Sequence, residues 1–312
     1  MGMLLVGIIG VSFAAIFIKM SDADPIAIAA WRMLFTVIIL APFTIVMQRK
    51  ELLSLKPFDL AFMGLIGIVL ALHFAFWNTS LQYTEVAPAT LLVTSHPIFV
   101  ALISHYVFKE RLGKYQAFGI GMAFCGAVIL VLPELLKMDF TGNQFIGACL
   151  ALVAAFAAGT YYMSGRKVRQ TRSLLTYVFV IYSVCTVVLF GIAFAGGIKL
   201  APLPWKEWVL FLLLALVPTI MGHTVHNLVL KHLEAYIVSV ALLGEPIGAT
   251  ILAIFFFHEI PSGFTIFGGL VIIAGIYMTI RGRPHEDSTS KGSEEEHDRR
   301  DGRAHRYHRR HR

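Results

Sequence analysis

Long apolar runs separated by short polar breaks make up the chain as far as residue 281. Runs such as LLVTSHPIFVALISHYVF do not alternate between apolar and polar positions, as the strands of a membrane barrel would. An isolated strand cannot satisfy its backbone polar groups in lipid, whereas a helix of about 20 apolar residues can span the bilayer. The pattern therefore predicts an all-α integral membrane protein with ten transmembrane helices. Their expected bounds are 2–19, 25–47, 58–82, 86–108, 114–133, 143–164, 173–196, 206–230, 235–257 and 262–281.

The composition favours the same interpretation. The 312 residues are 57% hydrophobic and 14% charged, whereas a soluble domain carries about 25% charged residues. Lipid must therefore cover much of the outer surface. The net charge of +7 does not indicate a nucleic-acid partner, because the excess of positive charge lies in the loops between spans.

The positive charges also predict an orientation. If the N-terminus is cytoplasmic, the inner loops hold thirteen Lys and Arg residues and the outer loops hold four. This bias predicts a multi-pass protein of the plasma membrane with both termini in the cytoplasm. The polar segment 284–312 ends in HRYHRRHR and is predicted to be a disordered tail, either passively solvated or binding metal or anionic lipid.

The chain contains an internal repeat at an offset of 149 residues. The block EVAPATLLVTSHPIFVALISHYVFKE aligns without a gap with EAYIVSVALLGEPIGATILAIFFFHE. We expect two five-helix units, at 1–134 and 143–282, and an odd number of helices per unit inverts the second copy relative to the first. The matched pairs are Glu85 and Glu234, Asn78 and Asn227, Pro97 and Pro246, Glu110 and Glu259, Gly119 and Gly268, and Gly126 and Gly275.

Four stretches resemble the drug/metabolite transporter superfamily, and specifically its ten-helix EamA-type members. They are GVSFAAIFIKM followed by Pro25 and WRMLF; SHPIFVALISHYVFKERL; GIGMAFCGAVIL; and GEPIGATILAIFFFHEIPSGFTIFGGLVIIAGIYM. The likeness covers about residues 3–282. It implies an inverted-repeat transporter with a central cavity, in a family that moves amino acids, other metabolites and drugs, often outward. The histidines of the third and eighth helices are not part of that pattern, so the resemblance assigns them no role.

Ionisable residues inside the membrane are costly and are candidates for function. Glu245 lies near the centre of the ninth helix, and its repeat mate His96 lies near the centre of the fourth. Each precedes a proline, Pro246 or Pro97, which cannot donate to the carbonyl four residues back. We expect kinked helices here and a third kink at Pro218. Glu245 and His96 either face a shared cavity and bind a substrate amine or a coupling proton, or Glu245 is protonated and bonds to another helix.

Further polar side chains gather on two other helices. The third carries His73, Trp77 and Asn78, and the eighth carries His223, His226 and Asn227, at spacings of three and four that share a helix face. Either these sets line one pathway, with Trp77 stacking on a ligand, or they bond between helices. Arg32 either meets an anionic substrate group, or it turns outward or pairs with Asp22 or Asp24.

Other classes of chemistry find little support. The spacing of His223 and His226 suits a metal, but only Glu245 could complete the set, so no metal site is predicted. Cys125, Cys149 and Cys185 lie in separate apolar runs and predict no disulfide. No HExxH, GxSxG or P-loop motif is present, so we expect neither an enzyme nor a cofactor.

Inverted repeats are typical of secondary transporters that work by alternating access. The sequence therefore predicts a transporter of small metabolites, with export of amino acids or related compounds as the leading hypothesis. The partners expected are a small-molecule substrate, the lipid bilayer and a coupling proton. The alternatives are a drug or organic-cation efflux transporter and, from another class, a non-transporting membrane scaffold or receptor.

Overall fold

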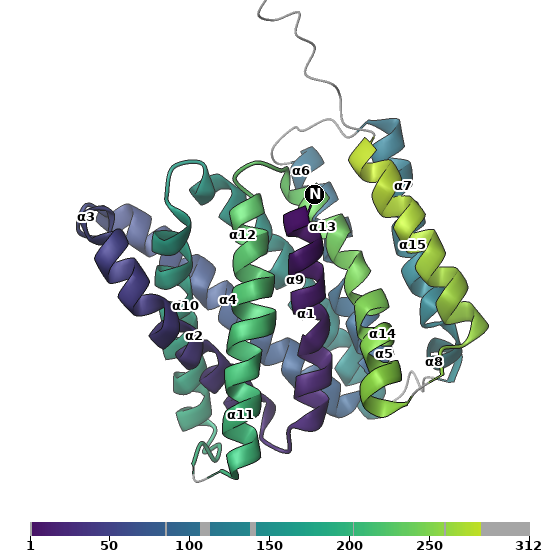
Figure 1. Ribbon diagram of the computed structural model, residues 1–312, viewed down its shortest axis with the longest axis horizontal. Helices are drawn as coiled ribbons and strands as arrows, with labels where there is room; N and C mark the ends of the chain where they lie inside the picture. Colours follow the sequence, from purple (N-terminus) through teal and green to yellow (C-terminus); the bar gives the residue numbers. More distant parts are fainter. Residues whose placement is uncertain are drawn as a thin grey trace, which may run out of the picture.

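The computed structural model describes residues 2–84, 86–106, 113–137, 142–201, 203–258 and 260–281. Within these ranges every regular element is a helix, and no strand occurs (Figure 1). The first half contains α1 (Gly2–Met20), α2 (Pro25–Met47), α3 (Arg49–Leu53), α4 (Pro57–Tyr83), α5 (Val86–Val93), α6 (His96–Tyr106), α7 (Lys114–Leu130) and α8 (Leu132–Lys137). The second half contains α9 (Gly142–Arg169), α10 (Leu174–Ala195), α11 (Trp205–Leu214), η1 (Ala215–Thr224), α12 (Val225–Val229), α13 (Ala235–Ala241), η2 (Leu242–Gly244), α14 (Glu245–Phe257) and α15 (Gly263–Arg281).

Eight continuous helical stretches in the described residues are long and apolar enough to cross a membrane. Two shorter apolar stretches, Ala89–Ala101 and Lys114–Leu130, lie between them in the chain. Many large apolar side chains point outward, and the side chains of Val46 and Phe255 are 80% and 72% exposed. Such a surface suits lipid rather than water, so the chain is a multi-pass membrane protein, helical in the residues that the structure describes.

Three of the predicted spans are not continuous α-helices. The fourth is broken between α5 and α6, the eighth passes through the π-helix η1, and the ninth passes through the 3-10 turn η2. Pro97 and Pro246 each occupy the second position of the helix that follows a break, where a missing N–H costs nothing. Pro218 lies inside η1. The glutamates Glu85, Glu110 and Glu259 of the predicted repeat lie outside the described residues, as does the tail 284–312.

The pair α7 and α15 packs along one side of the bundle (Figure 1). A Cβ atom built on Gly126 would lie 2.9 Å from the carbonyl oxygen of Gly268, and one on Gly275 would lie 2.7 Å from that of Gly119. The two helices therefore run antiparallel and touch through their backbones. Only glycine allows this approach.

Polar contacts join the two halves at the end of the bundle that holds α3. The Glu51 carboxylate accepts hydrogen bonds from the Ser173 backbone N–H at 2.9 Å and from the Thr176 hydroxyl at 3.0 Å. Beside them, Arg172 and Asp59 form a salt bridge of 2.5 Å. The turn between α9 and α10 is thereby anchored to α3 and to the start of α4.

Candidate functional site

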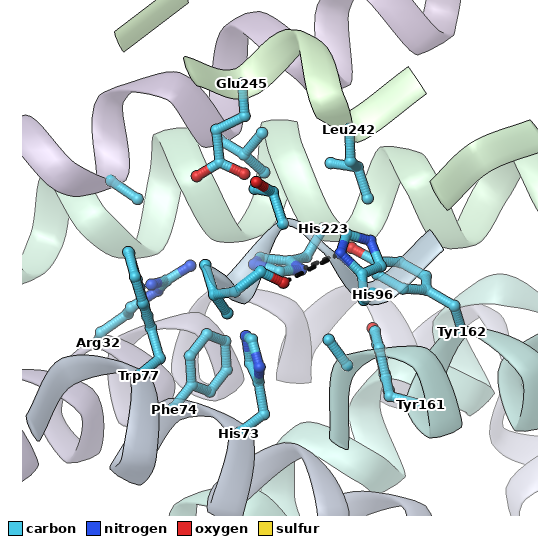
Figure 2. A pocket seen from close by; sticks show the side chains of 15 residues that line it. Arg32, His73, Phe74, Trp77, His96, Tyr161, Tyr162, His223, Leu242 and Glu245 are labelled. Atoms are coloured by element: carbon cyan, nitrogen blue, oxygen red, sulfur yellow. Dashed lines mark hydrogen bonds between the residues drawn. The ribbon is translucent and has the colours of Figure 1, made fainter. Parts of the chain in front are cut away.

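A cavity of about 40 Å³ lies in the middle of the bundle, lined by side chains from both halves (Figure 2). It has room for no more than a few water molecules. Its walls come from α1, α2, α4, α9, η1 and the two helix breaks. The lining residues are Val11, Ala14, Arg32, His73, Phe74, Trp77, Val93, Thr94, His96, Ala158, Tyr161, Tyr162, His223, Leu242 and Glu245.

Arg32 supplies the positive charge of this cavity. Its side chain is buried, with 1% of its surface exposed, and its Nε donates a hydrogen bond of 2.6 Å to Thr219 Oγ1. The guanidinium lies over the Phe74 ring, 4.6 Å from its centroid, and Nη2 has no hydrogen-bond partner among the described residues. The alternative of an outward-turned arginine does not hold, because Asp22 instead pairs with Lys206 and Asp24 accepts from the Ile26 backbone.

Glu245 supplies a carboxyl group and is the first residue of α14. The break before α14 places the side chain on the cavity, and Figure 2 shows the carboxylate and the Arg32 guanidinium both extending toward its middle. In the described part of the chain, these two groups form no ion pair with each other. The guanidinium and the carboxyl group therefore face one cavity without forming a direct ion pair.

Three histidines line the same space, each held by a neighbour. His73 Nδ1 lies 2.9 Å from the Ala154 carbonyl oxygen, and His223 Nδ1 lies 3.4 Å from the Tyr162 hydroxyl. His96 Nδ1 lies 3.2 Å from the carbonyl oxygen of Val93, which Pro97 leaves without its usual helical partner.

His96 has one ring nitrogen still available. Its ring stacks on the Tyr162 ring at 5.5 Å between centroids, and its buried Nε2 has no partner among the described residues. A buried polar atom in this condition requires water or a ligand. Together with Arg32 Nη2, it gives the cavity two unsatisfied polar atoms.

The cavity includes six of the nine predicted binding residues. Asn78, His226 and Asn227 do not line it. Asn78 donates to the Pro25 carbonyl at 3.0 Å and joins α4 to α2. Asn227 donates to the Tyr161 hydroxyl of α9 and, within its own span, to the His223 carbonyl at 2.8 Å. His226 is fully buried against α1, where Gly7 leaves room for its ring.

Three lining aromatic residues were not predicted. Phe74 follows His73 directly in α4, and Tyr161 and Tyr162 are neighbouring buried residues of α9. The available signal was the small-residue run AAFAAGT before the tyrosines, which lets neighbouring helices approach α9 closely. Thr219, the partner of Arg32, was also missed.

No group of three or more His, Cys, Asp or Glu side chains suited to a metal occurs in the ranges that the structure describes. His223 lines the cavity and His226 does not, so the two do not act together there. The arrangement offers a cation, a carboxylate, imidazoles and aromatic faces, which suits recognition of a small polar molecule rather than covalent chemistry.

Known proteins provide an independent comparison. A protein of Archaeoglobus fulgidus named as an uncharacterized transporter is 26% identical over 274 residues, covering 86% of this chain and 92% of its own. The probable amino-acid metabolite efflux pump of Salmonella typhimurium is 24% identical over 296 residues, covering 90% and 94%. The pseudopaline exporter CntI of Pseudomonas aeruginosa is 24% identical over 208 residues, covering 66% and 70%.

A solved structure described only as a crystal structure of protein superposes with a TM-score of 0.76 at 17% identity, over 91% of this chain and 98% of that one. At this identity the match shows the fold. The sequence also matches the model of a protein family, EamA-like transporters, over residues 1–132 and 145–281. These ranges make up most of the chain and include every residue that lines the cavity. The chain therefore belongs to the EamA-like transporter family.

Proposed function

We propose that this protein is a secondary active transporter, rather than an enzyme, that exports amino acids or closely related zwitterionic metabolites across the plasma membrane. The observation that carries the proposal is the presence of Arg32 and Glu245 on one membrane-buried cavity without a direct ion pair. A zwitterion supplies a carboxylate for the guanidinium and an ammonium group for the carboxylate, and so satisfies both buried charges. The name of the Salmonella relative supports the same substrate class.

The proposed architecture is ten spans arranged as two inverted repeats, with both termini in the cytoplasm. The helix starts support the repeat: α2 and α10 begin at residues 25 and 174, α6 and α14 at 96 and 245, and α7 and α15 at 114 and 263. Each pair differs by 149 residues, the offset seen in the sequence. The two short stretches, one containing α5 and α6 and the other α7, complete ten spans when added to the eight long ones.

The contacts of α7 with α15 support the inversion. At an offset of 149, Gly119 is the mate of Gly268 and Gly126 is the mate of Gly275. Gly119 touches Gly275, the mate of Gly126. Gly126 touches Gly268, the mate of Gly119. Such reciprocal contacts are what a two-fold axis between antiparallel copies produces.

The size of the cavity supports alternating access. About 40 Å³ holds a few water molecules but no amino acid. The cavity must widen to load its substrate, and the breaks before His96 and Glu245 are the places where the helices can bend. Glu245 can bind either the substrate amine or a coupling proton, which then drives export.

The test is counterflow in liposomes that contain the purified full-length chain. Labelled neutral amino acids should accumulate, and both Arg32→Gln and Glu245→Gln should weaken substrate binding by about 30-fold or more, as loss of one buried charge partner does elsewhere. Arg49→Gln, which changes an exposed arginine of α3, is the matched control and should transport normally.

Two outcomes would contradict the proposal. Unchanged amino-acid counterflow in Arg32→Gln would show that Arg32 does not bind the carboxylate of the substrate. Transport of a lipophilic organic cation that needs Glu245 but not Arg32 would favour the drug-efflux alternative. An imposed proton gradient that drives flux in the wild type but not in Glu245→Gln would identify the carboxylate as the coupling group.

A further inference from the structure

A second cavity, of about 210 Å³, lies between the start of α4 and the end of α9. Phe58 and Asp59 belong to the first turn of α4, Lys167 to the last turn of α9, and Arg172 to the turn before α10. Because α4 and α9 are both long enough to cross the membrane, a cavity at their ends lies where the chain leaves the hydrocarbon layer. That is the level of the lipid headgroups.

The walls of this second cavity combine aromatic rings with positive charge. Phe58 is 80% exposed, and the Lys167 ammonium lies over the Phe62 ring, 5.8 Å from its centroid. Arg172 is neutralised by Asp59 at 2.5 Å. No ion pair to Lys167 is present in the described part of the chain, so its charge is available to an anion.

The local backbone holds these groups in place. Glu51 anchors the turn that carries Arg172 by accepting hydrogen bonds from Ser173 and Thr176. At the start of α4, Lys56 makes no side-chain capping hydrogen bond. As in any helix, the first N–H groups of α4 point toward its N-terminal end, where they add to the positive potential beside Lys167.

We propose that this cavity binds an anionic phospholipid, with its phosphate at Lys167 and an acyl chain along Phe58 and Phe62. An amphipathic ligand of this kind matches an apolar wall that is open to the bilayer and a cation at its rim. Basic pockets between spans on the cytoplasmic side are typical sites for such headgroups, and the loop charges predict that this end of α4 and α9 faces the cytoplasm. The inference does not depend on the transport proposal.

Native mass spectrometry of the purified full-length chain tests it, with titration of phosphatidylglycerol against phosphatidylcholine. The wild type should retain a first phosphatidylglycerol more tightly than phosphatidylcholine. Lys167→Gln should weaken that first binding step about fivefold, the effect of one lysine near a membrane surface. Lys167→Arg keeps the charge and should bind as the wild type does.

Lys231→Gln is the matched control, because Lys231 is an exposed lysine that does not line the cavity. Normal binding by this variant together with weak binding by Lys167→Gln would support the site. Equal weakening by both variants would mean that diffuse surface charge attracts the lipid, and the proposal would be wrong. It would also be wrong if Lys167→Gln bound phosphatidylglycerol as tightly as the wild type.

Discussion

Thr219 holds the guanidinium of Arg32 in the central cavity. The two residues are 187 positions apart, and the hydroxyl also donates to the Leu214 carbonyl at 2.8 Å, five residues back. That spacing belongs to the π-helix η1, in which the backbone is wider than in an α-helix. The irregular helix thereby turns a small hydroxyl toward a buried charge.

We expect Thr219→Val to weaken binding of a carboxylate substrate about tenfold, because a hydrogen bond to a charged group contributes about 1.5–3 kcal/mol. Valine keeps the shape of threonine, so the fold should remain. The measurement is the KM of amino-acid counterflow. Thr186→Val is the control, since Thr186 is also buried but donates only to the Tyr182 carbonyl of its own helix. Equal effects of the two variants would contradict a specific role for Thr219.

The ionised carboxylate of Glu51 links α3 to the α9–α10 turn by accepting hydrogen bonds from it. Burial by itself raises the pKa of the Glu51 carboxyl, but hydrogen bonds from Ser173 and Thr176, with Arg172 nearby, outweigh it and leave the pKa below its usual value. A lowered pKa means that the ionised carboxylate stabilises the folded protein. This contribution is present above the pKa of the unfolded chain and is lost as the pH falls through the folded one.

Thermal unfolding in detergent from about pH 7 to about pH 3 should therefore show a fall in Tm for the wild type. Glu51→Gln should be less stable at neutral pH and should lose less on acidification. Asp22→Asn serves as the control, because Asp22 is an exposed carboxylate at the other end of the bundle. Parallel curves for the wild type and Glu51→Gln would exclude this role.

At the scale of helices, the pairing of α7 with α15 depends on glycine. A Cβ at Gly119 would meet the Thr279 backbone nitrogen at 2.6 Å, and one at Gly268 would meet the Leu130 nitrogen at 2.4 Å. Backbone atoms cannot move aside as the tip of a long side chain can. The two helices must separate to admit even a methyl group.

Gly119→Ala and Gly268→Ala should each destabilise the protein by about 1–3 kcal/mol, the usual cost of overpacking. Because these positions are repeat mates, the two losses should be similar. Gly121→Ala is the control on the same helix, since a Cβ there has open space around it. Differential scanning calorimetry of the purified variants compares their thermal stability. A Gly268→Ala protein as stable as the wild type would contradict the close pairing.

The loop charges predict the orientation of the whole molecule in the membrane. A membrane-impermeant maleimide should label Lys199→Cys in intact cells and should label Ser54→Cys only after permeabilisation, in a background without native cysteines. Both positions are exposed, and they lie in loops predicted to be on opposite sides. The reverse pattern would invert the proposed topology, and labelling of both in intact cells would contradict it.

Much of the fold could be predicted from the sequence, because lipid imposes a length and an apolar composition on every span. The repeat could be recognised in the sequence because Pro and Gly positions recur at one offset. The three prolines predicted irregular helices in the fourth, eighth and ninth spans, but not the form that each irregularity takes. Side-chain hydrogen bonds from Thr94 and Ser95 to carbonyls within the preceding turn compete with the helical ladder, and sequence hydrophobicity does not reveal such local competition.

By itself, the sequence determined the class of protein, the ends of most spans and the set of costly ionisable residues from which a site could be built. Only the tertiary structure decided which of them meet. Arg32, Glu245 and the histidines of α4, α6 and η1 share the cavity, whereas Asn78, His226 and Asn227 pack elsewhere. Helical spacing shows which side chains share a face, but the rotation of each helix is set by contacts between residues far apart in the chain.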